Sequence, residues 1–153
     1  MALTEKEKRG FEVFTGRGRC IACHSGSHLA NNTFFTSVGV PELSPASMFR
    51  DLGRFEVTKD PTTKLFFKVP SLRNISTSAP YFHNGAMPTL RSVVEHYNNA
   101  FKSIDEYTIP KHYEQTSVVP LRLHNNAVQV ENLKKSIQAP FLRHGLGLTE
   151  SVS

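Results

Sequence analysis

The stretch Cys20-Ile21-Ala22-Cys23-His24 decides how the rest of this chain is interpreted. Cys-x-x-Cys-His is the attachment signature of c-type haem. The spacing has a physical reason, because two thiols one turn apart can each add to a haem vinyl group. The adjoining imidazole of His24 is then held against the iron as its proximal ligand. The pentapeptide therefore predicts one covalently bound haem c, attached through Cys20 and Cys23.

Three other interpretations compete for the two cysteines. A thioredoxin-like redox pair needs a βαβ context, which this sequence does not show. Half of a zinc site needs a second Cys or His pair at suitable spacing, and none is present. Chance is the third, and the helix predicted just before the pair argues against it. With only two cysteines in the chain, a disulfide scaffold is excluded.

Length and composition predict one globular domain. The chain has 153 residues, 39% of them hydrophobic and 20% charged. No run approaches eighteen consecutive apolar residues, so a transmembrane helix is not expected. The net charge is +5, but the basic residues are interspersed with glutamates and form no sustained run. This favours a solvated face or an acidic protein partner over nucleic acid.

Local signals predict three helices. Thr4 and Glu7 have capping-box spacing and begin the first helix, which ends at Gly16 and Gly18 just before the pentapeptide. Thr89 caps the second helix, over 90–98. The third helix covers about 126–138 and stops before a proline. We expect segment 25–47 to be loop, and no strand pair is evident. A single domain is predicted over 1–138, followed by a frayed tail over 139–153.

Four further segments carry a family resemblance. They are Gly53-Arg54-Phe55-Glu56-Val57-Thr58, Phe67-Lys68-Val69-Pro70-Ser71-Leu72-Arg73-Asn74, Ala79-Pro80-Tyr81-Phe82-His83-Asn84-Gly85, and Pro88-Thr89-Leu90-Arg91-Ser92-Val93-Val94-Glu95-His96-Tyr97-Asn98. With the pentapeptide, they resemble the bacterial di-haem cytochrome c peroxidases, including the MauG-type members. The match spans about residues 5 to 100, and beyond that it is weak. The chain looks like the C-terminal, electron-transferring domain of such a protein.

The resemblance implies a fold and a set of partners. The fold would be all-α and cytochrome c-like, with long loops and with N- and C-terminal helices crossing over the haem. The partner would be a second haem domain or a redox protein, either a small cytochrome or a cupredoxin. Haem is normally attached to cysteines outside the cytoplasm, so we expect a periplasmic protein. The charged start, Met1 to Arg9, lacks the apolar stretch of a signal peptide, so we expect a chain from which the signal is missing.

The sixth iron ligand is left open between two side chains. Tyr97 falls where peroxidases of this family carry a methionine and where MauG-type relatives carry a ligating tyrosine. Independently, it is centred on the apolar stripe Leu90, Val93, Val94 and Tyr97 of its helix, from which His96 is turned about 100° away. Tyr97 could instead be a core aromatic with a hydrogen-bonded hydroxyl. Met87 is the rival ligand, and an open or water-bound iron is the last alternative.

Other residues receive roles of lower specificity. Arg73 could neutralise a haem propionate, with a surface ion pair as the alternative. His83 could hydrogen-bond near the haem edge, or serve only to shape its loop. The resemblance implies a calcium site between the two domains, to which Ser78 and Pro80 would contribute, but its other ligands would lie outside this chain.

Three classes of function follow from these residues. The first is an electron-transfer domain that relays electrons to or from a second haem or a substrate. The second is an enzyme that reduces peroxide or oxidises a protein at this haem. That function needs an open or displaceable sixth position and distal acid–base groups, and the sequence shows no such pair. The third is a haem-based sensor or binding module.

Overall fold

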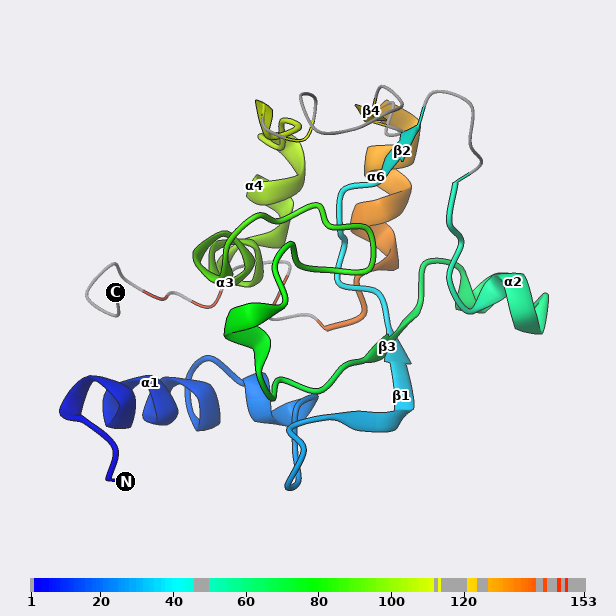
Figure 1. The fold of residues 1–153 in the computed structure, drawn as a ribbon. Coiled ribbons are helices and arrows are strands. Elements are labelled where there is room, and N and C mark those ends of the chain that lie inside the picture. The colour runs from blue at the N-terminus through cyan, green and yellow to red at the C-terminus, as the bar shows by residue number, and fades with distance from the viewer. Residues whose placement is uncertain are drawn as a thin grey trace.

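The computed structural model describes residues 2–45, 50–111, 113, 121–123, 127–139, 142, 146 and 148. The described helices are α1 (Glu5–Thr15), α2 (Phe55–Thr58), α3 (Leu90–Asn98), α4 (Ala100–Asp105) and α6 (Ala127–Ser136), joined by the 3₁₀ helices η1 (Cys20–Ala22), η2 (Pro61–Thr63) and η3 (Ile75–Thr77). The strands are β1 (Asn31–Thr36), β2 (Leu43–Pro45), β3 (Phe67–Val69) and β4 (Leu121–Leu123). Figure 1 shows their arrangement. No helix in these ranges is long and apolar enough to cross a membrane.

All three predicted helices are confirmed. The Thr4 side chain accepts a hydrogen bond from the Glu7 N–H, and the Glu7 carboxylate accepts one from the Thr4 N–H, so the capping box is complete. Thr89 and Ser92 form the same reciprocal pair at the start of α3. The third prediction corresponds to α6. These helices were found because their signals are local.

The prediction of an all-α fold is wrong. β1 pairs antiparallel with β3, and β2 pairs antiparallel with β4. Part of the predicted loop 25–47 is therefore strand. The register between β1 and β3 is interrupted between Asn31 and Phe35, and β2, β3 and β4 are each three residues long. Strands this short cannot display a period-2 pattern, so they left no signal in the sequence.

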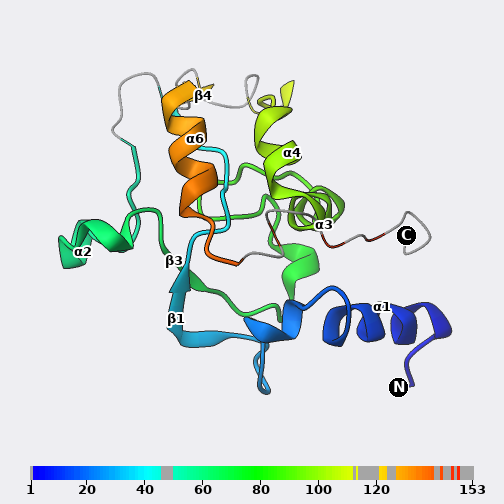
Figure 2. The same cartoon turned by 180° about the vertical axis from the view of Figure 1, so that it is seen from behind.

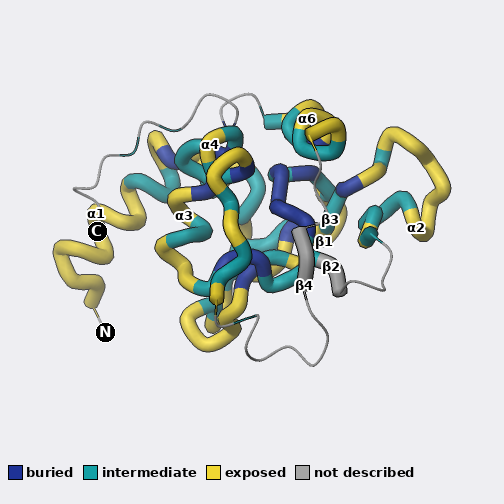
Figure 3. Tube along the Cα trace, turned by 90° about the horizontal axis from the view of Figure 1, so that it is seen from above, coloured by how far each residue is buried: buried dark blue, intermediate teal, exposed yellow. Residues whose placement is uncertain are grey.

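The core of the described residues lies between α4 and α6. Its buried members are Leu65, Ala100, Ile104, Leu133, Ile137 and Leu142. Segment 37–42 crosses this core, and Gly39 (φ +72°) lies directly against Ile104 and Ile137. Figure 3 shows the buried positions gathered in this central part, while α1 is exposed over residues 5–12 and half-buried over 13–15.

The expected crossing of N- and C-terminal helices is not found in the described part of the chain. α1 buries none of its residues, and Phe11 is 58% exposed. In Figures 1 and 2, α1 and α6 lie at opposite ends of the molecule. The buried face of α6, carrying Leu133, is already covered by α4 and the core residues. The most buried apolar residue of α6 therefore packs against α4 rather than α1, although Val128 of α6 is 70% exposed.

Candidate haem site

The pentapeptide is held in a single tight turn after α1. Cys20 begins η1, and the His24 N–H donates to the Cys20 carbonyl at 2.9 Å. The turn depends on Gly18, because a Cβ there would lie 2.6 Å from the Val13 carbonyl oxygen. Both thiols are unpaired and partly buried, and this burial raises the pKa of both Cys20 and Cys23. The two sulfurs therefore lie on one turn, as attachment to one haem requires.

The imidazole of His24 is oriented by two backbone carbonyls. Its Nδ1 lies 3.1 Å from the Leu29 oxygen and 3.1 Å from the Pro70 oxygen. A carbonyl oxygen can only accept, so Nδ1 carries the hydrogen and Nε2 keeps its lone pair. This is the tautomer of a histidine that binds a metal through Nε2, with its other nitrogen donating to a backbone carbonyl.

Further hydrogen bonds fasten the loop after His24 to the segment that begins at Pro70. Ser71 Oγ donates to the His28 carbonyl at 2.7 Å. Arg73 donates from Nε at 2.8 Å, and also from Nη2, to the Ser27 carbonyl. The guanidinium of Arg73 is exposed and holds the loop rather than an acidic side chain. Its predicted contact with a haem propionate stays a prediction.

Tyr97 lies on α3 and packs against the core cluster. Burial raises the pKa of its phenol, and the charges of Cys23 and Cys20 raise it further. The hydroxyl therefore lies within electrostatic range of both sulfurs. The Tyr81 and Tyr107 hydroxyls donate to backbone carbonyls, at 2.9 and 2.7 Å, but no described contact gives the Tyr97 hydroxyl a hydrogen bond. A phenol oxygen without a hydrogen-bond partner could serve as a ligand to the iron of a bound haem.

The apolar stripe of α3 is partly exposed on the side that carries Tyr97. Leu90 is 37% exposed and Val94 is 54% exposed. His96, which the stripe leaves out, is instead completely buried. Its Nε2 donates to the Val38 carbonyl at 2.8 Å, and its Nδ1 accepts from Ser103 Oγ at 2.9 Å. His96 thus fastens α3 to the core, and Tyr97 on the neighbouring face packs against the core cluster from a partly buried position.

The structure buries Met87 and stacks the ring of His83 on an aromatic side chain. Met87 is only 4% exposed, and its backbone pairs with that of Tyr81. The His83 ring is stacked on Phe67, with ring centroids 3.6 Å apart. Burial against that ring lowers the pKa of His83, and Asp51 opposes the shift. Met87 as alternative ligand and His83 at the haem edge both stay predictions.

The predicted calcium contribution also stays a prediction. Ser78 Oγ donates to the Ile75 carbonyl at 3.1 Å, and Pro80 is exposed beside it. Within the described ranges, no three His, Cys, Asp or Glu side chains come together as a metal site.

Several residues that shape the site were not found from the sequence. The carbonyls of Leu29 and Pro70 are backbone groups, which no motif marks. Asn84 donates to the Pro41 carbonyl at 2.8 Å and accepts from the Ala86 N–H, so it fixes the loop that precedes α3. The sequence offered one usable signal, the Asn-Gly pair at 84–85, which is typical of a turn.

The donor set fits a covalently attached haem. Two thiols on one turn and an imidazole with a free Nε2 are what c-type attachment and proximal ligation need, and the phenol of Tyr97 is a candidate for the second ligand. The fold and these groups define a cytochrome c-like haem domain.

Comparison with known proteins agrees with this class. The family model described as "RoxA-like, cytochrome c-like" matches residues 67–99. Cytochrome-c peroxidase IdrP2 of Denitromonas iodatirespirans is 37% identical over 120 residues, covering 63% of this chain and 32% of that protein. The methylamine utilization protein MauG of Methylophilus methylotrophus is 30% identical over 148 residues, covering 92% of this chain and 41% of that protein.

Solved structures show the same relationship. A MauG-like protein associated with microbial copper homeostasis has a TM-score of 0.57 and 26% identity, over 93% of this chain and 49% of that one. The diheme peroxidase BthA of Burkholderia thailandensis has a TM-score of 0.52 at 20% identity, which supports the fold alone. The chain is a relative of the di-haem cytochrome c peroxidases and MauG proteins, as its motifs indicated. It spans 32% of the length of the peroxidase IdrP2 and 41% of the length of the MauG protein.

Proposed function

We propose that this chain is a c-type haem domain with His24 and Tyr97 as axial ligands, which relays electrons between a redox partner and a second haem or a substrate. The observation that carries the proposal is the orientation of His24, whose Nδ1 lies against the Leu29 and Pro70 carbonyls and leaves Nε2 for the iron. The charges of Cys20 and Cys23 act on the phenol of Tyr97, which supports Tyr97 as the second ligand. Cys20 and Cys23 would hold the haem covalently, and the haem supplies one-electron redox chemistry when bound.

The surroundings of Tyr97 favour electron transfer over catalysis. The same face of α3 presents Leu90, Val93 and Val94, whose side chains neither donate nor accept protons. A distal acid–base pair of the kind that peroxide cleavage needs is therefore not supplied by this face. A phenolate ligand would stabilise ferric iron and give a low reduction potential, whereas a thioether from Met87 would favour ferrous iron.

Absorption spectroscopy of the haem-loaded protein tests the ligand assignment. We expect Tyr97→Phe to change the ferric spectrum and raise the reduction potential, because the iron loses an anionic ligand. Tyr107→Phe is the matched control, since it removes a partly buried hydroxyl that donates to the Ala86 carbonyl. A methionine-to-iron charge-transfer band that disappears in Met87→Leu would assign the ligand to Met87 and refute our proposal.

The names of the relatives favour a second candidate, peroxide reduction at this haem. Several of them are called cytochrome c peroxidases. This function requires a sixth position that opens, so it predicts a high-spin ferric signal that changes when peroxide is added. A low-spin signal that peroxide leaves unchanged would eliminate this candidate and leave electron relay.

The remaining proposals concern the setting of the domain. Because the chain covers less than half of its relatives, we propose that it works beside a second haem domain, on the same chain or on another. A small cytochrome or a cupredoxin would exchange electrons with it in the periplasm. A calcium ion at Ser78 and Pro80 would need ligands from that second domain, so its uptake should occur only when both domains are present.

A further inference from the structure

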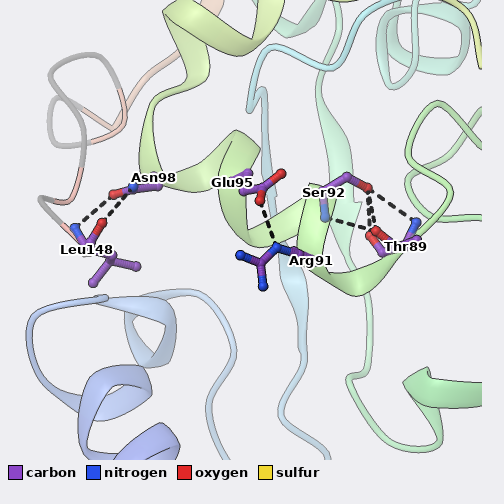
Figure 4. A network of polar contacts seen from close by, with 6 residues as sticks. All are labelled: Thr89, Arg91, Ser92, Glu95, Asn98 and Leu148. Atoms are coloured by element: carbon purple, nitrogen blue, oxygen red, sulfur yellow. Dashed lines mark hydrogen bonds and ion pairs between the residues drawn. The ribbon is translucent and has the colours of Figure 1, made fainter. Parts of the chain in front are cut away.

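The last residue of α3 binds two residues from near the C-terminus of the chain. The Leu146 N–H donates to the Asn98 carbonyl at 2.8 Å. The Asn98 side chain donates from Nδ2 to the Leu148 carbonyl at 3.0 Å and accepts at Oδ1 from the Leu148 N–H at 2.9 Å. Figure 4 shows this pair of parallel contacts between Asn98 and Leu148. One residue thus supplies all three bonds.

These bonds use the particular chemistry of an asparagine at a helix end. A primary carboxamide offers a donor and an acceptor side by side, so it can pair with the N–H and C=O of one residue as a neighbouring strand would. The main-chain carbonyl of Asn98 belongs to the last turn of α3, where no later helical N–H is available to it. The Leu146 N–H satisfies that group. Serine, aspartate or alanine at position 98 could not make the same set of contacts.

The attachment lies beside the proposed iron ligand. Asn98 directly follows Tyr97, and Leu142, which is 5% exposed, belongs to the core cluster against which Tyr97 packs. The described residues 142, 146 and 148 therefore run from the core next to Tyr97 to the helix end just beyond it. In the view of Figure 4, Leu148 lies between the end of α3 and the N-terminal ribbon.

We propose that Asn98 is a positioning residue that controls access to the Tyr97 side of the haem. While Asn98 holds Leu146 and Leu148, the end of α3 is fixed and small ligands reach the sixth position of the iron slowly. When the contacts open, Tyr97 can move away from the iron and an external ligand can replace it. The proposal rests on the proposed function, because it takes the face of α3 with Tyr97 to be the distal side of the haem.

Cyanide binding to the ferric, haem-loaded protein measures this access. We expect Asn98→Ala to increase the association rate about tenfold, since it removes two hydrogen bonds but leaves the one to the main-chain carbonyl. Asn98→Asp should give a similar increase, because a carboxylate accepts from the Leu148 N–H but repels the Leu148 carbonyl. The matched control is Asn99→Ala. Its side chain caps α4 through the Lys102 N–H at 3.0 Å and has no contact with Leu146 or Leu148 among the described residues.

We call the contacts of Asn98 with Leu146 and Leu148 the latch. A double-mutant cycle separates the effect of losing the latch from the effect of a general loosening of α3. Deletion of residues 146–153 should raise the cyanide rate at least as much as Asn98→Ala does, because it also removes the Leu146 contact, and the combined variant should be no faster than the deletion alone. A rate for Asn98→Ala within twofold of the unmodified protein would overturn the proposal. An equal acceleration in Asn99→Ala, or additive effects of Asn98→Ala and the deletion, would overturn it too.

The two proposals fail in different ways. If Tyr97→Phe leaves the spectrum unchanged, the ligand assignment fails, but cyanide still binds the iron and Asn98→Ala still tests the latch. If Tyr97→Phe changes the spectrum while Asn98→Ala leaves the cyanide rate unchanged, the ligand assignment stands and the latch is refuted. Amide hydrogen exchange gives a readout that is independent of the iron. The Leu148 N–H should exchange faster in Asn98→Ala and keep its rate in Asn99→Ala.

Discussion

Replacement of Gly39 by alanine should be among the most damaging small changes in this protein. Gly39 has φ +72°, and an added Cβ would lie 2.7 Å from Ile137 Cδ1, 2.9 Å from Ile104 Cδ1 and 3.0 Å from Ile137 Cγ1. Flexible side chains could relieve such contacts at a surface. Here Ile137 is 0% exposed and Ile104 is 5% exposed, so neither has free space to move into.

The expected loss can be divided into two parts with a matched control. Gly26 has φ +70°, but an added Cβ there would meet nothing within 4 Å. Gly26→Ala should therefore lose only the cost of a left-handed backbone, about 1 kcal/mol. Gly39→Ala adds overpacking of the core, about 1–3 kcal/mol more. We expect its free energy of unfolding to fall by about 3 kcal/mol in total.

Urea denaturation of the haem-loaded proteins, followed by far-ultraviolet circular dichroism, measures both losses. A third variant, Gly10→Ala, should have a higher free energy of unfolding than the unmodified protein. Gly10 lies inside α1 and its added Cβ would be in open space, so this variant should gain about 0.5–1 kcal/mol. If Gly39→Ala loses no more than Gly26→Ala, the contacts with Ile104 and Ile137 do not restrain this segment and the reasoning is refuted.

The other predictions concern His96 and Arg73. His96→Phe should lower the free energy of unfolding by about 3 kcal/mol, because the Val38 carbonyl and Ser103 hydroxyl are left unpaired in the core. The double variant with His96→Phe and Ser103→Ala should lose less free energy of unfolding than the sum of the losses in the two single variants, as measured by denaturation. Burial lowers the pKa of His96 from its ordinary 6.5, so the unfolded chain binds more protons and stability should fall as pH drops below about 6.5. That slope should be shallower in His96→Phe, and an unchanged slope would contradict the assignment. Arg73→Lys keeps the charge but loses one of two donors to the Ser27 carbonyl, so the rate of proteolysis near Ser27 should increase. In Arg73→Gln the rate of proteolysis near Ser27 should increase further.

The parts of the fold that could be predicted are those with short-range signals. Thr4 with Glu7, and Thr89 at the start of α3, satisfy helix ends through contacts three residues apart, which a sequence displays directly. β1 and β3 show the opposite case. Asn31 and Val69 are paired across 38 positions of sequence, and β3 has only three residues. Their pairing depends on tertiary context, which no local pattern records.

The candidate site also has residues that the sequence predicts and residues that it does not. Cys20, Cys23 and His24 form a contiguous motif, and Tyr97 stood out through helical periodicity. The orientation of His24 could not be predicted, because it depends on the Leu29 and Pro70 carbonyls, and any residue supplies a carbonyl. Periodicity also placed the apolar stripe of α3 without showing what covers it.

The direction in which Tyr97 points from α3 depends on its two neighbours in sequence. Consecutive residues of an α-helix point about 100° apart, so His96, Tyr97 and Asn98 face three different directions. His96 is fixed to Val38 and Ser103 in the core, and Asn98 is fixed to Leu148 on another side. A helix held at two such points cannot rotate about its axis, and the direction of Tyr97 is thereby determined. The His96 ring also lies edge-on to the Tyr97 ring, with centroids 5.9 Å apart, so variants at His96 should change the surroundings of the phenol directly. Variants at Asn98, which contacts Leu148 and not the phenol, should act through the rotation and mobility of α3.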